Sequence, residues 1–468
     1  MSETVTEPEI DPTEGTDALD EDFVLSPSFI QRVLDALDLG HAEEVKELLK
    51  PLHAADVADL VGLVSPRERR ELIDMMGESL DPEVLSELEP DVRGQVLEYL
   101  DPIVLAQAIE SLDSDDAVFV LEDLPEAQQR EILNQLPEAD RTAVEMGLLY
   151  PEETAGRLMT RGFVALPPYW TVGEAIDFMR ESDDLPDDFF EIYVVDPSYH
   201  PVGAVHLSRV LRTKRGVRIE DLMEEDLHII PADLEQEEAA YAFEQYDLVS
   251  APVVDEGGRL VGMITIDDIL DVIQEEAEED ILALGGVGDE GLSDTVMTTT
   301  TRRFSWLFVN LLTAIIASLV IAVFQTSIEQ VVALAVLMPI VASMGGNAGT
   351  QTLTIAVRAL ATKDLTPTNA GRIILREALV GWINGLLFAL VMGLIAVFWF
   401  HSVGLAAVIG AAMVLTLLAG GLAGILIPLW LQRVGADPAV SSAVFVTTVT
   451  DVVGFSSILG LATWLLLG

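Results

Sequence analysis

Asp451 is an acidic residue near the middle of Ala439–Leu467, an apolar segment long enough to cross a bilayer. A carboxylate at that depth costs about 3 kcal/mol or more and usually marks an ion or substrate pathway. Thr447, Thr448 and Thr450 place hydroxyl groups within a turn of it. Pairing with another helix or protonation would also suit a buried acid, but no Lys or Arg lies deep in any apolar segment. A cation in a wet pathway is therefore the best partner for Asp451.

A second acidic pattern lies in residues 266–285, "IDDILDVIQEEAEEDILALG". Apolar residues at helical spacing form one stripe of the predicted helix, and acids recur at every fourth position on another face: Asp267, Asp271, Glu275 and Glu279. Like charges at this spacing oppose the helix by about 0.2–0.5 kcal/mol per pair. Divalent cations would remove the repulsion, because oxygen clusters are what Mg²⁺ and Ca²⁺ prefer. A solvated acidic face is the alternative interpretation.

The segment "MPIVASMGGNAGTQT", residues 338–352, combines small and polar residues within an apolar run. Its glycines allow close approach of backbones, and Asn347 and Gln351 add polar side chains. Such a segment lies either beside a water-filled cavity or in a tight helix–helix contact. For the later segment "AGGLAGILIPLW", residues 419–430, we favour helix packing.

Five apolar runs are each long enough to span about 30 Å of hydrocarbon as a helix. They are Ser305–Thr326, Val331–Val357, Ala378–Phe400, Leu405–Leu431 and Ala439–Leu467. Lys and Arg occur before the first run and in the connections after the second and fourth, but not in the other two connections. The positive-inside rule then predicts a cytoplasmic N-terminal part, five spans and a C-terminus outside the cell (inner) membrane.

The formal net charge of −53 belongs almost entirely to the residues before the spans. Residues 301–468 contain five acids, Glu329, Asp364, Glu377, Asp437 and Asp451, and the other 73 of the 78 acids precede them. Such a polyanion repels nucleic acid and attracts cations. The chain has only four lysines, so adaptation of a soluble surface to high salt is an equally good explanation of the bulk charge. With no cysteine, disulfides and cysteine-ligated metal sites are excluded.

Residues 1–24 are acidic and predict a disordered tail. Residues 25–150 contain short amphipathic stretches separated by prolines, which are typical of first helical positions: Pro66, Pro82, Pro90, Pro102, Pro125 and Pro137. Stacked short helices in a superhelical array fit this pattern best.

A repeat follows, because "EIYVVDPSYHPVGAVHLSRVLR" is echoed by "SAPVVDEGGRLVGMITIDDILDVI". Each copy predicts the order strand, helix, strand, turn, strand, helix. The pair resembles tandem CBS domains, an α/β regulatory module that often binds adenosyl nucleotides. The resemblance implies possible ATP binding at Thr265 and Asp268, in the segment that usually holds the ribose.

In sequence order, a helical superhelix, a CBS pair, an acidic linking helix and five spans resemble the MgtE family of magnesium channels. The specific marks are "PIVASMGGNAGTQT", "RFSWLFVNLLTA" and "DPAVSSAVFVTTVTDVVGF". The expected fold is therefore multidomain, with an all-α N-terminal domain, an α/β CBS pair, an acidic "plug" helix and an all-α transmembrane domain. The expected boundaries are 1–24 for the tail, 25–150, 151–217, 218–273, 266–300 for plug helix and linker, and 301–468.

The resemblance also implies a homodimer in the lipid bilayer whose second and fifth spans line the pore. Asp451 would hold a hydrated Mg²⁺ there, with Gly345, Gly346, Asn347 and Thr448 lining the path. Cytoplasmic Mg²⁺ bound between the N-terminal domain, the CBS domains and the plug helix would favour closure. The implied sensor residues are Asp115, Asp116, Asp247, Asp268, Asp271, Glu276 and Glu279.

We therefore expect a Mg²⁺-selective uptake channel that cytoplasmic Mg²⁺ closes. One alternative is a proton- or sodium-coupled transporter of Mg²⁺, Mn²⁺ or Co²⁺, and another is a nucleotide-sensing membrane protein that conducts nothing. An enzyme is not expected, because none of the six histidines falls in a metal-hydrolase motif.

Overall fold

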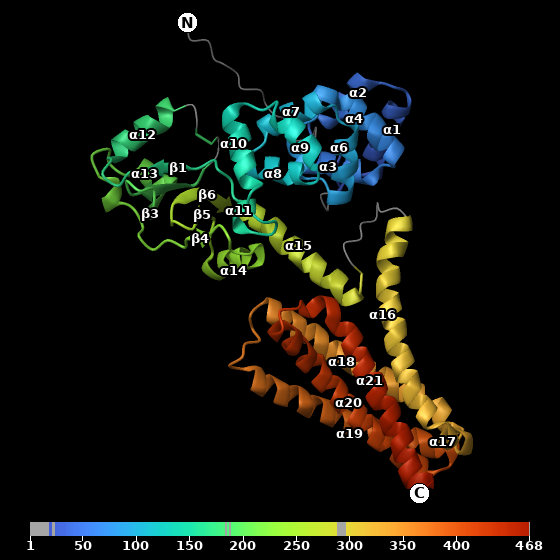
Figure 1. Ribbon diagram of the computed structural model, residues 1–468. Coiled ribbons are helices and arrows are strands. Elements are labelled where there is room, and N and C mark those ends of the chain that lie inside the picture. The colour runs from blue at the N-terminus through green and yellow to red at the C-terminus, as the bar shows by residue number, and fades with distance from the viewer. Residues whose placement is uncertain (1–17, 21–23, 183–184, 187–188, 288–295, 468) are drawn as a thin grey trace. The chain divides into compact units, whose positions relative to one another are not determined.

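The computed structural model describes residues 18–20, 24–182, 185–186, 189–287 and 296–467 (Figure 1). Most of the predicted acidic tail and residues 288–295 of the predicted linker lie outside these ranges. The chain divides into two compact units, Met1–Ile273 and Gln274–Gly468, and the division falls within one helix.

The first part of the first unit is all-α, as predicted. Its α-helices are α1 (Pro27–Asp38), α2 (Ala42–Leu49), α3 (Ala54–Leu63), α4 (Pro66–Met76), α5 (Glu83–Ser86), α6 (Pro90–Tyr99), α7 (Pro102–Ser111), α8 (Ser114–Glu122), α9 (Glu126–Leu133) and α10 (Glu138–Gly147). Proline occupies the first position of α1, α4, α6 and α7, whereas Pro82, Pro125 and Pro137 stand one residue earlier, as N-caps. One continuous apolar core runs through these helices and begins at Ala18, which is buried.

Two repeats of the predicted order complete this unit. After α11 (Ala155–Leu158), the first contains β1 (Val164–Leu166), α12 (Val172–Glu181), β2 (Glu191–Val195), β3 (Pro201–His206) and α13 (Leu207–Arg212). The second contains β4 (Ile230–Pro231), α14 (Gln236–Tyr246), β5 (Ser250–Val254), β6 (Leu260–Thr265) and α15 (Ile266–Gly285). In each sheet the first strand pairs parallel to the middle strand, and the last strand pairs antiparallel to it.

The second unit holds the end of α15 and the apolar helices. These are α16 (Val296–Val323), the short α17 (Gln325–Gln330), α18 (Ala333–Ala361), α19 (Ala370–Phe400), α20 (Val403–Arg433) and α21 (Pro438–Ala462), followed by a π-helical turn, Thr463–Leu467. The described residues include five helices that are long and apolar enough to cross a membrane, which confirms the predicted number of spans. The helix of the third span begins eight residues before the predicted apolar run, and this extension brings Glu377 into α19.

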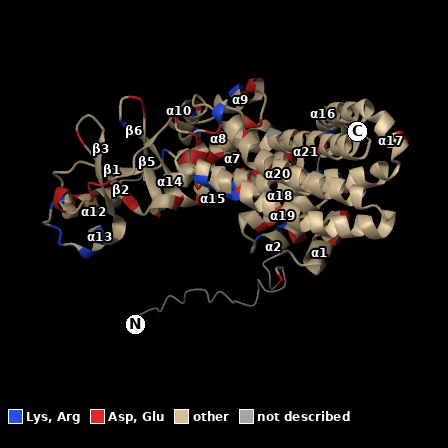
Figure 2. Cartoon of the chain, turned by 90° about the horizontal axis from the view of Figure 1, so that it is seen from below, with Lys and Arg blue, Asp and Glu red and all other residues tan. Residues whose placement is uncertain are grey.

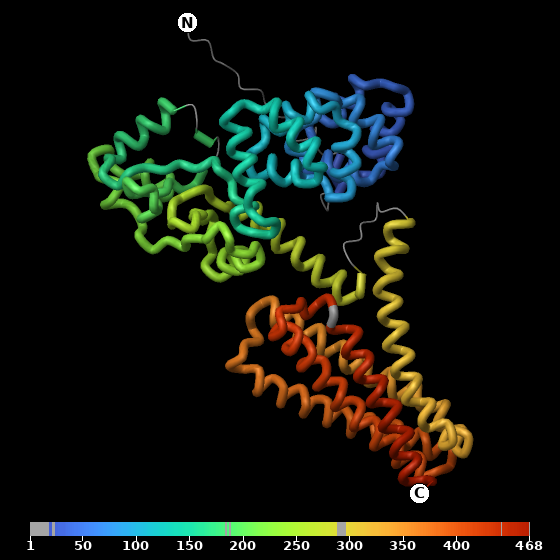
Figure 3. Tube along the Cα trace, in the orientation of Figure 1, coloured from blue at the N-terminus to red at the C-terminus, as the bar shows by residue number. Residues whose placement is uncertain are grey.

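The traces of α18, α20 and α21 run side by side in Figure 3, with α19 packed on α20. Glycines permit these contacts. A Cβ atom added to Gly424 would lie 2.6 Å from the carbonyl oxygen of Gly349, and one added to Gly420 would lie 2.7 Å from that of Gly345. The packing interpretation of residues 419–430 therefore agrees with the structure.

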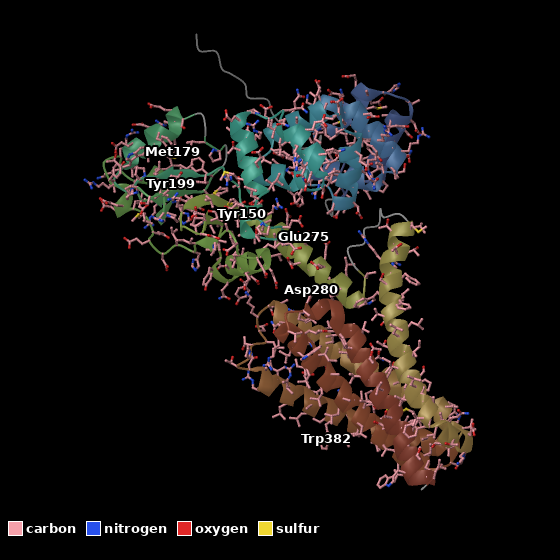
Figure 4. All side chains as sticks on the ribbon, in the orientation of Figure 1. Tyr150, Met179, Tyr199, Glu275, Asp280 and Trp382 are labelled. Carbon is pink, nitrogen blue, oxygen red and sulfur yellow. The ribbon has the colours of Figure 1, made fainter. Side chains whose placement is uncertain are left out.

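The two units differ in charge as the sequence predicts. Figure 2 shows acidic residues spread over the helices and repeats of the first unit and sparse along α18–α21. Apolar side chains cover α19, where Trp382 points away from the neighbouring helices (Figure 4).

Candidate metal sites and pore segment

Three predicted sensor acids come together in the first unit. Asp115 and Asp116 lie in the first turn of α8, and Asp268 lies in the first turn of α15. The positive ends of the two helix dipoles favour anions at these positions. We call Asp115, Asp116 and Asp268 the α8–α15 cluster.

The surroundings of these three carboxyl groups disfavour their ionised forms. Burial, then the charge of Asp268, and then that of Asp116 raise the pKa of Asp115 well above its usual range. Burial and the charge of Asp113 raise the pKa of Asp116 to about 6. The pKa of Asp268 rises to about 7, chiefly by burial, although a hydrogen bond from Thr265 opposes the rise.

One oxygen of the cluster is also unsatisfied. Asp115 Oδ1 is fully buried and accepts no hydrogen bond from the described residues. A buried acceptor without a partner is destabilising by about 1–3 kcal/mol, and more when it is charged. In contrast, Thr265 Oγ1 donates to Asp268 Oδ2 at 2.6 Å. A cation at this cluster would supply the partner that Asp115 Oδ1 lacks.

Asp271 faces a carboxylate that the sequence analysis missed. The pKa of Glu87, at the end of α5, is raised by burial and then by the charge of Asp271, and the pKa of Asp271 is raised as well, first by burial and then by Asp267. No sequence motif marks Glu87, because its importance depends on which face of α5 packs toward α15.

Asp247 is not part of this cluster. It forms the left-handed C-cap of α14 and lines a cavity of about 260 Å³ together with His228, Tyr246 and Glu191. Neither Thr265 nor Asp268 is among the residues that line that cavity.

The second unit contains Glu276 and Glu279, which lie in the latter half of α15. Next to them is Asp280, labelled in Figure 4, whose pKa is raised by burial and then by the charge of Asp437. Asp437 is the N-cap of α21 and accepts a hydrogen bond from the Ala439 amide at 2.7 Å. The carboxyl groups of Asp280, near the end of α15, and Asp437, at the start of α21, are therefore near neighbours. The sequence signal for it was the Asp-Pro start of α21, which we had not connected with α15.

Asp451 is half-exposed on α21, and no described residue donates a hydrogen bond to it or forms an ion pair with it. On the same face, the hydroxyls of Thr447 and Thr448 donate to backbone oxygens of their own helix, at 2.8 and 2.7 Å. Because their protons are used in this way, their lone pairs remain available to a hydrated cation.

The predicted pore-lining residues of α18 divide into two groups. Gly345 is buried, and a Cβ atom added to it would clash with Thr416 of α20, so it is a packing position. Gly346 is half-exposed and Asn347 is exposed, as a lining residue would be, and Thr448 of α21 is half-exposed.

Glu377, a buried acid of the helical bundle, was not identified from the sequence. Its side chain is 9% exposed, and it lies two turns into α19. The sequence analysis had begun the third span at Ala378, because Arg372 and Arg376 looked like loop charges. The helix continues through both arginines instead.

Direct metal ligation is not preformed. Within the described ranges, no three Asp, Glu or His side chains converge as a metal ion would require. An ion at the α8–α15 cluster would therefore keep much of its own water, which is the usual behaviour of Mg²⁺.

A second cavity, of about 430 Å³, is lined mainly by the first repeat, with Val249 of the second. Phe189, Phe190, Leu207 and Leu211 supply its apolar wall, and Glu191 and His206 are shared with the smaller cavity. Among the described residues that line the two cavities, none is Lys or Arg. The aromatic wall suits a nucleobase, whereas the phosphates of a nucleotide would find no basic side chain there.

Comparisons with known proteins agree with this architecture. A family model described as a divalent cation transporter, MgtE, matches residues 338–461. The model of the MgtE intracellular N domain matches residues 52–153, and the CBS domain model matches residues 155–216 and 219–275.

Three curated relatives cover most of the chain. The magnesium transporter MgtE of Enterococcus faecalis is 35% identical over 65% of this chain and 67% of its own length. The protein of that name from Bacillus subtilis is 32% identical over 69% and 71%, and the one from Thermus thermophilus is 36% identical over 70% and 73%. The chain belongs to the MgtE family.

Membership of the MgtE family confirms the resemblance seen in the sequence and the multidomain fold class. Among solved structures, the cytosolic domain of the Mg²⁺ channel MgtE in complex with ATP is 31% identical, covers 52% of this chain and 99% of that chain, and has a TM-score of 0.48. The soluble part of a magnesium transporter is 27% identical, covers 53% and 98%, and has a TM-score of 0.45. The chain is thus a membrane protein of a transporter family, with a CBS pair before its spans.

Proposed function

We propose that this member of the MgtE family is a Mg²⁺-selective channel for magnesium uptake, closed by Mg²⁺ on the cytoplasmic side. Three relatives that bear the name magnesium transporter support Mg²⁺ as the cargo. The observation that carries the gating proposal is the α8–α15 cluster, in which buried acids raise one another's pKa and no Lys or Arg among the described residues offsets the rise.

The proposed sensor works by charge compensation. When Mg²⁺ is scarce, Asp115, Asp116 and Asp268 repel one another, and the contact between α8 and α15 is weak. When Mg²⁺ is abundant, a hydrated ion satisfies Asp115 Oδ1 and bridges the two helices. Because a shift from mostly open to mostly closed needs about 5 kcal/mol of differential binding, several such sites must act together. Glu87 with Asp271, and Asp280 with Asp437, are the further candidates.

In the proposed pore, Asp451 meets a Mg²⁺ that retains its water. Mg²⁺ dehydrates reluctantly, so a carboxylate and helix hydroxyls that contact its hydration shell can select it without stripping it. One carboxylate per chain is little charge for a divalent ion, and a homodimer would bring two together on its axis. Among the residues described in α16, Ala317 is the one that is buried, so most of this helix is left for lipid or for a partner chain to cover.

The proposed topology has the acidic N-terminal unit in the cytoplasm and the C-terminus outside. The distribution of Lys and Arg among the connections supports it. In this orientation the α8–α15 cluster samples the cytoplasmic Mg²⁺ concentration, as a sensor for uptake must.

Flux into liposomes tests the proposal. Purified protein should pass Mg²⁺ at fixed voltage, and a saturating concentration of Mg²⁺ on the cytoplasmic face should close it. Asp451→Ala should lower selective Mg²⁺ flux by about a hundredfold or more, since a charge at the ion's binding position is lost. Asp364→Ala, which changes an exposed acid outside α18 and α19, is the matched control and should leave the flux unchanged.

Three results would contradict the channel. Full selective flux in Asp451→Ala would remove the pore assignment. Flux that depends on a proton or sodium gradient at fixed voltage would favour the coupled transporter of Mg²⁺, Mn²⁺ or Co²⁺. A protein that passes no divalent cation, yet binds nucleotide, would fit the non-conducting nucleotide sensor.

We also propose that the CBS pair can bind ATP, with its base against Phe189 and Phe190 and not at Thr265 and Asp268. The size and aromatic wall of the larger cavity support this position. Because no Lys or Arg is among the described residues of the lining, Mg²⁺ would have to accompany the phosphates. Calorimetry should therefore detect ATP with Mg²⁺ and much weaker binding without it; equal binding in EDTA would contradict this arrangement.

A further inference from the structure

Glu377 is a buried acid with a complete set of partners. Arg376, its neighbour in sequence, donates to Oε1 from Nε at 3.1 Å and from Nη2 at 2.8 Å. Thr352 Oγ1 of α18 donates to Oε2 at 3.3 Å. The carboxylate thus joins two helices, while the side chain of Arg376 is 61% exposed and keeps part of its charge in contact with water.

The hydroxyl of Thr352 differs from its neighbours in where its proton goes. Helical Ser and Thr commonly donate to a backbone oxygen three or four residues earlier. Thr354, two residues further along α18, does so, with Thr350 as the acceptor at 3.0 Å. Thr352 instead donates to a side chain of another helix. It is therefore placed to hold α18 in one rotation about its axis.

Three helices meet at this point. A Cβ atom added to Gly424 of α20 would lie 2.8 Å from Cβ of Thr352, and one added to Gly421 would lie 3.2 Å from the carbonyl oxygen of Glu377. A turn of α18 would therefore break the hydrogen bond between Thr352 and Glu377 and disturb these close contacts with α20.

The rotation of α18 about its own axis determines which of its residues are exposed. Thr352 is buried together with Gly345 and Gly349, which lie on its side of the helix, whereas Asn347 and Thr350 are exposed on other sides. A turn of α18 would exchange packed and open positions in the segment that the proposed function assigns to the pore.

A carboxylate is a poor choice if packing were its only task. Replacing a buried ion pair by apolar side chains of similar volume is often neutral or stabilising. We propose that Glu377 is a positioning residue for conduction, which acts through Thr352 to fix the rotation of α18 and so present Asn347 to the ion path. This inference rests on the proposed function in one respect, that its first test measures Mg²⁺ flux.

Thr352 offers the sharper test, because Thr352→Val keeps the shape and removes the donor, while Thr352→Ser keeps the donor. With one hydrogen bond lost, we expect Thr352→Val to lower the maximal Mg²⁺ flux about tenfold, with the half-saturating Mg²⁺ concentration changed less than about twofold. Thr352→Ser should keep most of the flux, and Glu377→Gln, whose carbonyl can still accept, should lie between. Thr354→Val is the matched control and should behave as the unmodified chain.

A second readout does not need transport. Because the chain has no cysteine, Asn347→Cys introduces a single thiol for a water-soluble methanethiosulfonate reagent. Its labelling rate in membranes should change by about tenfold in the Thr352→Val background, and stay constant with Thr352→Ser or Thr354→Val.

The results of these experiments distinguish failure of the proposed function from failure of the inference about Thr352 and Glu377. If the unmodified protein passes no Mg²⁺, the proposed function fails, but the labelling rates still decide the role of Thr352. Equal rates and equal flux in Thr352→Val and the unmodified chain would overturn the inference. Equal impairment of Thr352→Val and Thr352→Ser would assign the site to packing, and a thiol at 347 that never reacts would show that this face of α18 meets no water; either result also overturns it.

Discussion

Buried acids occur in both units of this protein, and they are satisfied in opposite ways. In the first unit, Asp115 is surrounded by other acids, and its Oδ1 has no partner among the described residues. In the second, Glu377 has Arg376 and Thr352 on its two oxygens. The desolvation problem is the same, but only the second site carries its cation within the chain.

This difference indicates which site can report on an ion concentration. A carboxylate paired with arginine stays paired at any Mg²⁺ level, so it suits the permanent positioning of a helix. A cluster of acids without a base is stable only when protons or metal ions enter it, so its stability follows their concentration.

The comparison also limits the high-salt explanation of the acidity. An acidic, lysine-poor surface accounts for exposed acids, which keep their hydration. It does not account for a carboxylate whose oxygen is buried, because salt adaptation acts at the solvent boundary. The α8–α15 cluster therefore needs a reason of its own, whatever the origin of the remaining charge.

The largest expected effect is on the free energy of unfolding, which should change in opposite directions when the acid is neutralised at the two sites. In Mg²⁺-free buffer, Asp268→Asn should stabilise the protein by about 1–3 kcal/mol, because burial and like charge raise the pKa of Asp268. Glu377→Gln should destabilise it by about 1–3 kcal/mol, because Arg376 loses its partner. Thermal unfolding of the full chain in detergent, followed separately for each transition, measures both.

Mg²⁺ provides the control for this pair of variants. A saturating concentration near 100 Kd should add about 2.7 kcal/mol to the unmodified protein and to Glu377→Gln, but much less to Asp268→Asn. If Asp268→Asn destabilised the Mg²⁺-free protein, or gained as much from Mg²⁺ as the unmodified chain, the cluster would be an ordinary structural site.

Much of the fold followed from local sequence patterns. The repeat, the five apolar runs and the acids of residues 266–285 are contiguous signals, so α15, the two βαββα repeats and the number of spans could be predicted. Asp451 was identifiable because a single charge in an apolar run is conspicuous.

The site residues that the sequence did not reveal depend on contacts between helices that are far apart in the chain. Glu87 stands in no motif, and Asp437, although it begins the segment "DPAVSSAVF", matters here only because of the helix it faces. Glu377 was assigned to a loop because charge was taken to end the third span, although an Arg beside it can reach water from within a helix. Gly345 reads equally well as a lining or a packing position, and only the clash with Thr416 decides between them.

The pH dependence should be smaller than these effects and opposite to ordinary acid denaturation. The folded pKa is about 6 for Asp116 and about 7 for Asp268, both above the usual 3.8. Because the folded state then binds more protons than the unfolded state, Mg²⁺-free stability should fall as pH rises from about 4 to 7 and level off above. Glu122, whose pKa burial raises to about 7 despite Arg157, should contribute to the same window.

Added Mg²⁺ should compete with these protons, so its stabilising effect should be greater at pH 8 than at pH 5. Unfolding midpoints at several pH values, with and without Mg²⁺, give both slopes. In the double variant Asp116→Asn, Asp268→Asn, a weaker slope due to Asp115 and Glu122 should remain. A stability that rises steadily from pH 4 to 8 in the unmodified chain would contradict the assignment.

The smallest effect is expected at the Asp280–Asp437 pair. Both acids belong to the second unit, but Asp437 is exposed and already accepts a hydrogen bond from the Ala439 amide at 2.7 Å, so their mutual repulsion is screened by water. Asp280→Asn should therefore shift the Mg²⁺ concentration that closes the channel upward by about two- to threefold and leave the open-state flux unchanged. Asp437→Asn would not be a matched change, because it weakens the N-cap of α21 as well. Measuring closure at low and high ionic strength sharpens the test. The Asp280–Asp437 pair acts through partly exposed charge, so its effect on closure should disappear in high salt. The buried α8–α15 cluster should keep most of its effect.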